Sequence, residues 1–302
     1  IVAIRVRGWD TIIQMSASYD LHTHSTASDG TLSPAALVQR ARRAGVDVLA
    51  LTDHDPTEGV TEARAAAEED GIRLVSGVEI SVTWSAMTVH IVGLGLREAE
   101  PALQQGLAGL RDYRDWRAGE IGRRLEKAGI PGAFEGAKAW SNGRLISRTH
   151  FARFLAEKGH AESVRDVFRK FLLHNKPGHV PGRWASLEDA VAWIAGAGGQ
   201  AVIAHPARYR MTRTKLRRLI GEFRECGGEG IEVVSGSHSR DECFTMARHA
   251  GDARLLASAG SDYHGPENPY VDLGRLPSMP HGVRPVWADW PEAATIGERS
   301  GL

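Results

Sequence analysis

The sequence predicts an α/β fold, a closed or nearly closed βα barrel with a helical insertion. Strand and helix patterns alternate over the first hundred residues and again after residue 175. Between these stretches, residues 101–174 show helical patterns and no convincing strand. Repeated strand–helix units are typical of a parallel sheet, and this many units favour closure into a barrel. We therefore expect a barrel formed by residues 19–100 and 175–290, interrupted by a helical insertion at 101–174.

The first barrel segment is predicted to contain four strands and two helices. The strands are expected at residues 19–24, 46–52, 72–82 and 88–96. Residues 46–52 are apolar without alternation, as in a strand that is buried on both faces. Ser33 can cap the first helix, Pro34 suits its first turn, and the helix is expected to end at Gly45. A second helix is expected over residues 57–70.

The insertion and the second barrel segment are assigned in the same way. In the insertion, leucine and isoleucine recur at helical spacing, at positions 103, 107, 110, 121 and 125. Two more helices are expected there, at residues 148–158 and 162–173. The second barrel segment should contain helices at 186–197, 214–226 and 239–250, and strands at 201–204, 230–234 and 255–259.

Composition limits the classes of partner. The 302 residues include 37 basic and 37 acidic side chains, so no overall charge attracts nucleic acid or a membrane. An anionic substrate must therefore be bound by a local site. The two cysteines, Cys226 and Cys243, are too few for a disulfide framework and fit a reduced, cytoplasmic protein. No apolar run approaches the length of a membrane span, and we infer neither a membrane nor a stable protein partner.

The first residues do not match the pattern of the remainder. Residues 1–14 lack the features of a secretory signal, and Met15 shortly precedes the first predicted strand. We expect residues 1–18 to be an N-terminal extension of the barrel, with Met15 as the natural start and the residues before it non-native.

Histidines and carboxylates gather where the predicted strands end. In a parallel barrel these ends open on one face, which is where active sites lie. In an extended segment, side chains two residues apart lie on the same side. His22 and His24, or Asp262 and His264, can therefore approach neighbouring ions. Each feature alone has an ordinary explanation: His90 could be a satisfied strand residue, and His205 before Pro206 a turn residue. Their joint placement predicts a metal site, with imidazole and carboxylate ligands suited to Zn, Mn or Fe.

Several short motifs resemble the PHP (polymerase and histidinol phosphatase) family. They are His22-Thr-His24-Ser, Ser28-Asp29-Gly30, Thr52-Asp53-His54-Asp55, Gly77-Val-Glu79, Ile203-Ala-His205-Pro206 and Gly260-Ser-Asp262-Tyr-His264. The segments around His90, Arg148 and Lys176 are most similar to 3′,5′-nucleoside bisphosphate phosphatases and to the related 5′→3′ exoribonucleases that act on short RNA.

This resemblance implies a distorted (β/α)7-like PHP barrel that holds three divalent ions, with manganese expected and zinc or iron as alternatives. The first ion would take His22, His24, Glu79 and Asp262. The second would share Glu79 and add His90 and His205. The third would take Asp29, His54 and His264. Asp53 and Asp55 would lie behind these ligands, orienting His54 or closing its turn.

Clustered divalent ions make hydroxide from water near neutral pH and offset the charge of phosphoryl oxygens. We therefore expect direct attack by metal-bound hydroxide, with His22, His24, Glu79 and Asp262 as the catalytic set. The substrate is expected to be a nucleotide or short RNA, and the reaction removal of the 3′-phosphate of a nucleoside 3′,5′-bisphosphate, with possible 5′→3′ trimming of RNA. Cationic and imidazole side chains could bind a second phosphate, and the candidates are Arg148, His150, Lys176, Arg208 and His238.

Three other functions fit parts of the sequence. A histidinol-phosphate-type phosphatase would share the metal site, although a small substrate needs less of a helical insertion. A catalytically silent PHP-like partner module would not be expected to keep every ligand. An amidohydrolase-type C–N hydrolase would share the barrel and the style of metal binding.

Overall fold

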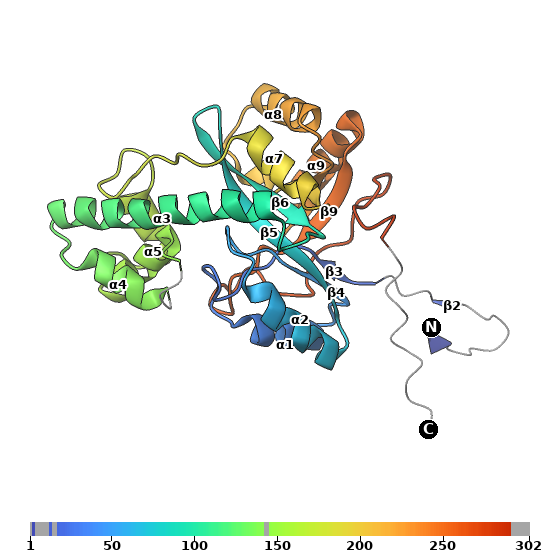
Figure 1. Ribbon diagram of the computed structural model, residues 1–302, viewed down its shortest axis with the longest axis horizontal. Helices are drawn as coiled ribbons and strands as arrows, with labels where there is room; N and C mark the ends of the chain where they lie inside the picture. The colour runs from blue at the N-terminus through green and yellow to red at the C-terminus, as the bar shows by residue number, and fades with distance from the viewer. Residues whose placement is uncertain (1, 4–11, 14–16, 142–144, 291–302) are drawn as a thin grey trace.

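The computed structural model describes residues 2–3, 12–13, 17–141 and 145–290. Its main feature is a seven-stranded sheet in which the strands follow one another in sequence order, β3 to β9 (Figure 1). These strands are β3 Tyr19–Asp20, β4 Val48–Leu51, β5 Arg73–Trp84, β6 Met87–Leu94, β7 Gln200–Ile203, β8 Gly230–Ser235 and β9 Leu256–Gly260. A separate antiparallel pair joins β1 (Val2–Ala3) to β2 (Ile12–Ile13), within the predicted N-terminal extension. The rest of that prediction concerns residues that are mostly outside the described part.

The ends of the sheet approach each other, so that the barrel is nearly closed and the predicted α/β barrel is confirmed. The N–H of Leu21 donates to the carbonyl of Ala259 at 2.9 Å, and Thr23 forms a parallel bridge with Tyr263. The first strand is shorter than the predicted 19–24, because the chain beyond β3 makes only such single links.

The prediction of an entirely parallel sheet was wrong at β6, which runs antiparallel to both β5 and β7. A two-residue turn, Ser85 and Ala86, joins β5 to β6, and both residues have positive φ, 48° and 62°. Two-residue hairpin turns of this kind favour Asn and Gly. The hairpin was missed because Ser-Ala is not a recognisable turn sequence.

Helices cover the outside of the sheet on two sides. In Figure 1, α1 (Pro34–Arg43) and α2 (Gly59–Asp70) lie below the sheet, and α7 (Leu187–Gly196), α8 (Arg213–Glu225) and α9 (Arg240–Ala253) lie above it. At the starts of α1, α7, α8 and α9, a serine or threonine hydroxyl accepts a backbone N–H group, as predicted for Ser33. No helix in the described part of the chain is long and apolar enough to cross a membrane.

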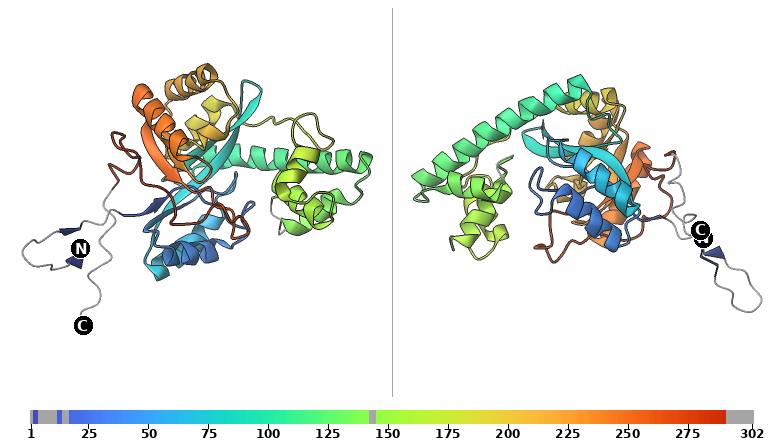
Figure 2. Two further views of the ribbon diagram at one scale, coloured as in Figure 1. Left: turned by 180° about the vertical axis from the view of Figure 1, so that it is seen from behind. Right: turned by 60° about the horizontal axis from the view of Figure 1, so that its bottom comes forward.

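The insertion forms a helical lobe beside the barrel (Figure 2). It contains α3 (Pro101–Lys127), α4 (Ala133–Trp140), α5 (Arg148–Glu157), α6 (Val164–Val167) and a π-helical turn at Phe168–Leu172. The first half of α3 is packed into the barrel core through Leu103 and Leu107. The second half contributes Ile121 to a separate core with Phe151 of α5. The long helix α3 therefore connects the two bodies by packing in both.

Candidate active site

Six segments bring the predicted metal ligands to one mouth of the barrel. His22 and His24 follow β3, His54 follows β4, His205 follows β7, and Asp262 and His264 follow β9. Glu79 lies within β5, where it forms a parallel bridge with His54. His90 lies in the first half of β6. Because β6 runs antiparallel to β5, the start of β6 lies at the same mouth as the ends of the parallel strands.

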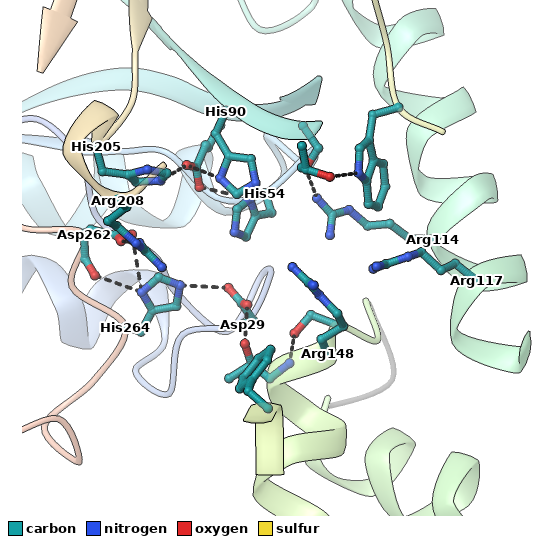
Figure 3. A pocket seen from close by; sticks show the side chains of 17 residues that line it. Asp29, His54, His90, Arg114, Arg117, Arg148, His205, Arg208, Asp262 and His264 are labelled. Carbon is teal, nitrogen blue, oxygen red and sulfur yellow. Dashed lines mark hydrogen bonds and ion pairs between the residues drawn. The ribbon is translucent and has the colours of Figure 1, made fainter. Parts of the chain in front are cut away.

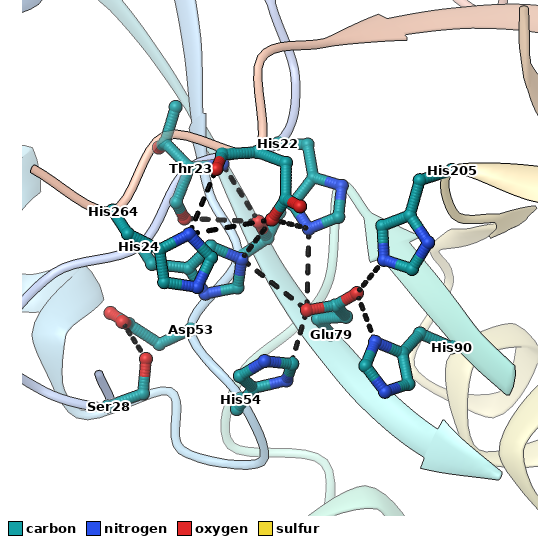
Figure 4. Close-up of polar contacts among 12 residues, drawn as sticks. His22, Thr23, His24, Ser28, Asp53, His54, Glu79, His90, His205 and His264 are labelled. Atoms are coloured by element: carbon teal, nitrogen blue, oxygen red, sulfur yellow. Dashed lines mark hydrogen bonds and ion pairs between the residues drawn. The ribbon is translucent and has the colours of Figure 1, made fainter. Parts of the chain in front are cut away.

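Five imidazoles surround the buried carboxylate of Glu79 (Figure 4). Its Oε2 lies 3.4 Å from Nε2 of His22, 3.4 Å from Nε2 of His24 and 3.0 Å from Nδ1 of His54. Its Oε1 lies 2.8 Å from Nδ1 of His90 and 3.1 Å from Nε2 of His205. One carboxylate thus faces ligands of all three ions that the family resemblance implies.

Two aspartates complete the cluster. Oδ1 of Asp262 lies 3.5 Å from Nε2 of His22 and 3.2 Å from Nε2 of His24. Oδ1 of Asp29 lies 3.2 Å from Nε2 of His264. Asp262 has a positive φ of 58°, so the expected extended Asp-x-His segment is not present, and the chain turns at this residue.

The ligand atoms form three groups in which all members lie within 4.8 Å of one another. The groups are His22, His24, Glu79 and Asp262; His24, Asp29, His54 and His264; and His54, Glu79 and His90. The first group is the set implied for the first ion. The other two groups contain the implied ligands of the second and third ions, with the exception of His205. Both groups include His54. His205 is in none of the three groups, although its Nε2 lies 3.1 Å from Oε1 of Glu79.

The chemistry of this donor set fits divalent metal ions. Buried polar atoms normally have hydrogen-bond partners, yet several here have none: Nε2 of His22, Nε2 of His24, Nδ1 of His54, Oε2 of Glu79 and Oδ1 of Asp29. Burial, together with neighbouring His264, lowers the pKa of His24 to about 3. Burial also lowers the pKa of His90 to about 4, although Glu79 opposes the shift. Both rings are therefore neutral near pH 7 and keep a lone pair for a metal.

Two neighbouring aspartates support the site by routes that differ from the expected contact with His54. Asp53 accepts hydrogen bonds from the backbone N–H of Ser25 at 2.8 Å and from the hydroxyls of Ser25 and Ser28 at 2.6 and 2.5 Å. It thereby closes the loop that leads to Asp29. Asp55 forms a buried ion pair with Arg114 of α3, and its N–H donates to the carbonyl of Glu79 at 3.2 Å.

Four arginines line the cavity next to the metal ligands (Figure 3). Arg208 is paired with Asp262, and Arg114 with Asp55. Arg117 is 8% exposed and donates to the carbonyl of Val180 at 3.0 and 3.3 Å. Burial and the nearby Arg148 and Arg114 lower the pKa of Arg117 to about 9.

Arg148 has no carboxylate partner in the described part of the chain and lies over the ring of Phe168, with Cζ 5.7 Å from its centroid. Burial and neighbouring arginines lower its pKa as well. Arg117 and Arg148 thus leave positive charge uncompensated at one wall of the cavity, which is where an anionic group would be stabilised.

The sequence had indicated Arg148 and Arg208 but not Arg114 or Arg117. The latter two lie three residues apart on one face of α3, with Cζ atoms 4.8 and 5.2 Å from the ring centroid of Trp184. Arginines on a long polar helix are usually solvated, so their spacing alone gave no reason to place them in a cavity.

The other predicted substrate residues lie elsewhere. His150 is 1% exposed, and its Nδ1 accepts the N–H of Ser147 at 3.0 Å, which caps α5. Lys176 is exposed and does not line the cavity. His238 also lies outside the cavity lining, and its Nε2 accepts the N–H of Ala207 at 3.3 Å beside the turn that carries Arg208.

The chain is similar to known proteins along most of its length. The model of the PHP domain family matches residues 20–179. The chain is 53% identical to a 3′,5′-nucleoside bisphosphate phosphatase from Chromobacterium violaceum over 90% of its length and 96% of that protein. It is 44% identical to the 5′-3′ exoribonuclease Rnm of Escherichia coli over 93% of its length and 96% of that protein.

Two solved structures share the fold. A structure of an amidohydrolase from Chromobacterium violaceum, with bound sulfate and no metal, superimposes with a TM-score of 0.87 and 53% identity, over 90% of this chain and 95% of that one. A protein from Bifidobacterium adolescentis that is assigned as a metal-dependent phosphoesterase superimposes with a TM-score of 0.78 and 29% identity, over 86% of this chain and 92% of that one.

Proposed function

The chain belongs to the PHP domain family, and from this premise we propose that it removes the 3′-phosphate of nucleoside 3′,5′-bisphosphates. Hydrolysis of phosphate esters is the activity for which its relatives are named. The observation that supports the particular substrate is the pairing, within one cavity, of a metal-ligand cluster with a wall of uncompensated arginines.

We propose three divalent ions, with manganese preferred and zinc or iron as alternatives, held by the nine residues of the sequence motifs. When bound, such ions lower the pKa of a coordinated water and offset charge on phosphoryl oxygens. Glu79 would be a ligand shared by two ions, and its two oxygens face different histidines, His22 and His90. Arg208, paired with Asp262, would hold that carboxylate in position.

The second phosphate of the substrate would bind at the opposite wall. Arg117 and Arg148 supply guanidinium groups that can donate two parallel hydrogen bonds to phosphate oxygens. They belong to α3 and α5 of the insertion, which we propose acts as a substrate-binding cap over the barrel. The ring of Trp184 lines the same cavity and offers an apolar face to the sugar or base.

The test compares three substrates with manganese-loaded protein: adenosine 3′,5′-bisphosphate, p-nitrophenyl phosphate and a 5′-phosphorylated dinucleotide. We expect the highest kcat/KM with the bisphosphate, and adenosine 5′-monophosphate as its product. Adenosine 3′-monophosphate as the product would reverse the assignment of the two ends. A higher kcat/KM with the dinucleotide would make RNA trimming the principal activity, as the name of the Escherichia coli relative indicates for that protein.

The alternatives predict other results. A histidinol-phosphate-type phosphatase would prefer a small monophosphate and would not need the arginine wall, the part of the cavity lined by Arg117 and Arg148. A C–N hydrolase would leave all three phosphate esters intact. A silent partner module would bind ions and hydrolyse none of the substrates.

A further inference from the structure

We propose that Glu232 is a positioning residue of the metal centre, which fixes the imidazole of His22 in the tautomer that can bind a metal and also holds the backbone of His205. No sequence motif indicated this glutamate. The inference rests on the metal site of the proposed function, and its test separates the two.

Glu232 lies within β8, where every residue is buried, and is itself 1% exposed. A carboxylate in an apolar strand is costly unless its oxygens are hydrogen-bonded. Both oxygens of Glu232 are: Oε1 lies 2.5 Å from Nδ1 of His22, and Oε2 accepts the backbone N–H of His205 at 2.6 Å. The register of β8 against β9 shifts between Glu232 and Val234, an irregularity of the kind that re-aims a side chain.

The two hydrogen bonds place Glu232 opposite Glu79. His22 and His205 stand between the two carboxylates, with their rings stacked at a centroid distance of 5.7 Å. Nε2 of His22 faces Oε2 of Glu79 at 3.4 Å, and Nε2 of His205 faces Oε1 of Glu79 at 3.1 Å (Figure 4). Glu232 therefore contacts ligands of the two ions that Glu79 would share.

The tautomer of His22 follows from this contact. An ionised carboxylate only accepts hydrogen bonds, so the shared hydrogen must be on Nδ1 of His22. In the neutral ring, which is the form that binds a metal, the lone pair is then on Nε2, an atom that is buried without a hydrogen-bond partner and points toward Glu79 and Asp262. Carboxylates commonly orient metal-binding histidines in this way.

The contact with His205 fixes an unusual backbone. His205 has a φ of 28° and a ψ of 54°, a backbone conformation that residues other than glycine rarely adopt, and it precedes Pro206. A hydrogen bond from its N–H to a buried carboxylate holds the turn in this conformation, and with it the direction of the His205 ring.

Glu232→Gln makes the test sharp because the amide has the same shape but only one accepting oxygen. The N–H of His205 can only donate, so the amide oxygen must face it, and the amide NH2 then faces Nδ1 of His22. His22 must accept there, and its hydrogen moves to Nε2, where it blocks the metal. We expect zinc affinity at the His22 site to fall by about 10- to 100-fold, the range for lost partners of metal-binding histidines.

The experiment measures zinc binding by calorimetry and elemental analysis, and ring protonation by NMR of ¹⁵N-histidine-labelled protein loaded with Zn²⁺. Glu229→Gln is the matched control, since Glu229 is an exposed residue immediately before the same strand. Supporting results are one fewer tightly bound ion in Glu232→Gln, a hydrogen on Nε2 of His22, and neither change in the control. Full zinc affinity in a folded Glu232→Gln protein would overturn the proposal.

A measurement on the parent protein covers the case in which Glu232→Gln does not fold. In the zinc-loaded parent, His22 should carry its ring hydrogen on Nδ1, and a hydrogen on Nε2 would overturn the proposal without any variant. If the parent binds no zinc at all, the proposed metal site fails instead.

Discussion

Replacing Arg148 with alanine would test whether the cavity has one end for the reacting phosphate and another for the second phosphate. Arg148 lines the cavity and has no carboxylate partner in the described part of the chain. Because Arg148 does not neutralise a buried carboxylate, its removal should change the free energy of unfolding little. Its guanidinium instead lines the part of the cavity where we propose that the second phosphate binds, so the loss should appear in turnover of the bisphosphate.

The size of the effect follows from the lost contact. Hydrogen bonds to charged groups contribute about 1.5–3 kcal/mol, and each 1.36 kcal/mol or so corresponds to tenfold in rate. A bidentate contact between Arg148 and phosphate should therefore cost about 10²-fold in kcat/KM. Hydrolysis of p-nitrophenyl phosphate, which has no second phosphate, should fall much less.

The assay compares kcat/KM for adenosine 3′,5′-bisphosphate and p-nitrophenyl phosphate in Arg148→Ala and in a control, Arg165→Ala. Arg165 is an exposed arginine of α6, so this variant loses the same charge from the same insertion. Equal losses on both substrates would mean that Arg148 contacts the reacting phosphoryl group. No loss on either would show that the arginine wall does not bind substrate.

Three further predictions follow from the same contacts. Asp262→Ala should lose bound metal and several orders of magnitude of activity while keeping its circular dichroism spectrum, and full metal content with full activity would contradict the ligand assignment. Arg114→Met leaves the fully buried Asp55 without its ion pair and should lower the free energy of unfolding by about 3–5 kcal/mol; a loss below about 1 kcal/mol in urea would refute this. Burial lowers the pKa of His264, but Asp29 and Asp262 outweigh it and raise the pKa to about 9. The metal-free protein therefore keeps that proton near pH 7, so metal affinity should rise with pH up to about 9, and calorimetry in two buffers should show one proton fewer released by His264→Gln; an unchanged count would contradict it.

The sequence predicted the barrel because apolar strands and capped helices leave strong local patterns. It missed the direction of β6, since strand direction depends on the turn before it, and Ser85 and Ala86 are not typical of a tight hairpin. It also missed α4 as a separate helix, because residues 101–174 form a continuous stretch of helical sequence. Both failures concern how neighbouring elements connect, which residue patterns describe least.

The cluster of candidate metal ligands could be predicted because its residues lie in short motifs close to strand ends. Glu232 could not, because its proposed role depends on contacts with two residues that are distant in the sequence and follow other strands. A lone glutamate in the apolar strand Gly-Ile-Glu-Val-Val was nevertheless a detectable anomaly. Lys176 and His238 lie outside the cavity lining, so their assignment to the substrate stays a prediction. Their residue types suit phosphate binding, but a residue type alone does not specify which surface a side chain faces.

The spacing between the two ends of the cavity is set by contacts that cross from the insertion to the barrel. Arg114 of α3 donates to Ser81 of β5 at 2.9 Å and pairs with Asp55, whose N–H bonds to Glu79. At the start of α5, the hydroxyl of Thr149 donates to Oδ2 of Asp29 at 3.2 Å, next to Arg148. The helices that carry Arg117 and Arg148 are therefore attached directly to residues of the proposed metal centre. Arginines fixed in this way would favour substrates whose second charge lies at one set distance from the reacting phosphate, which is the property that separates a ribose bisphosphate from a simple monophosphate.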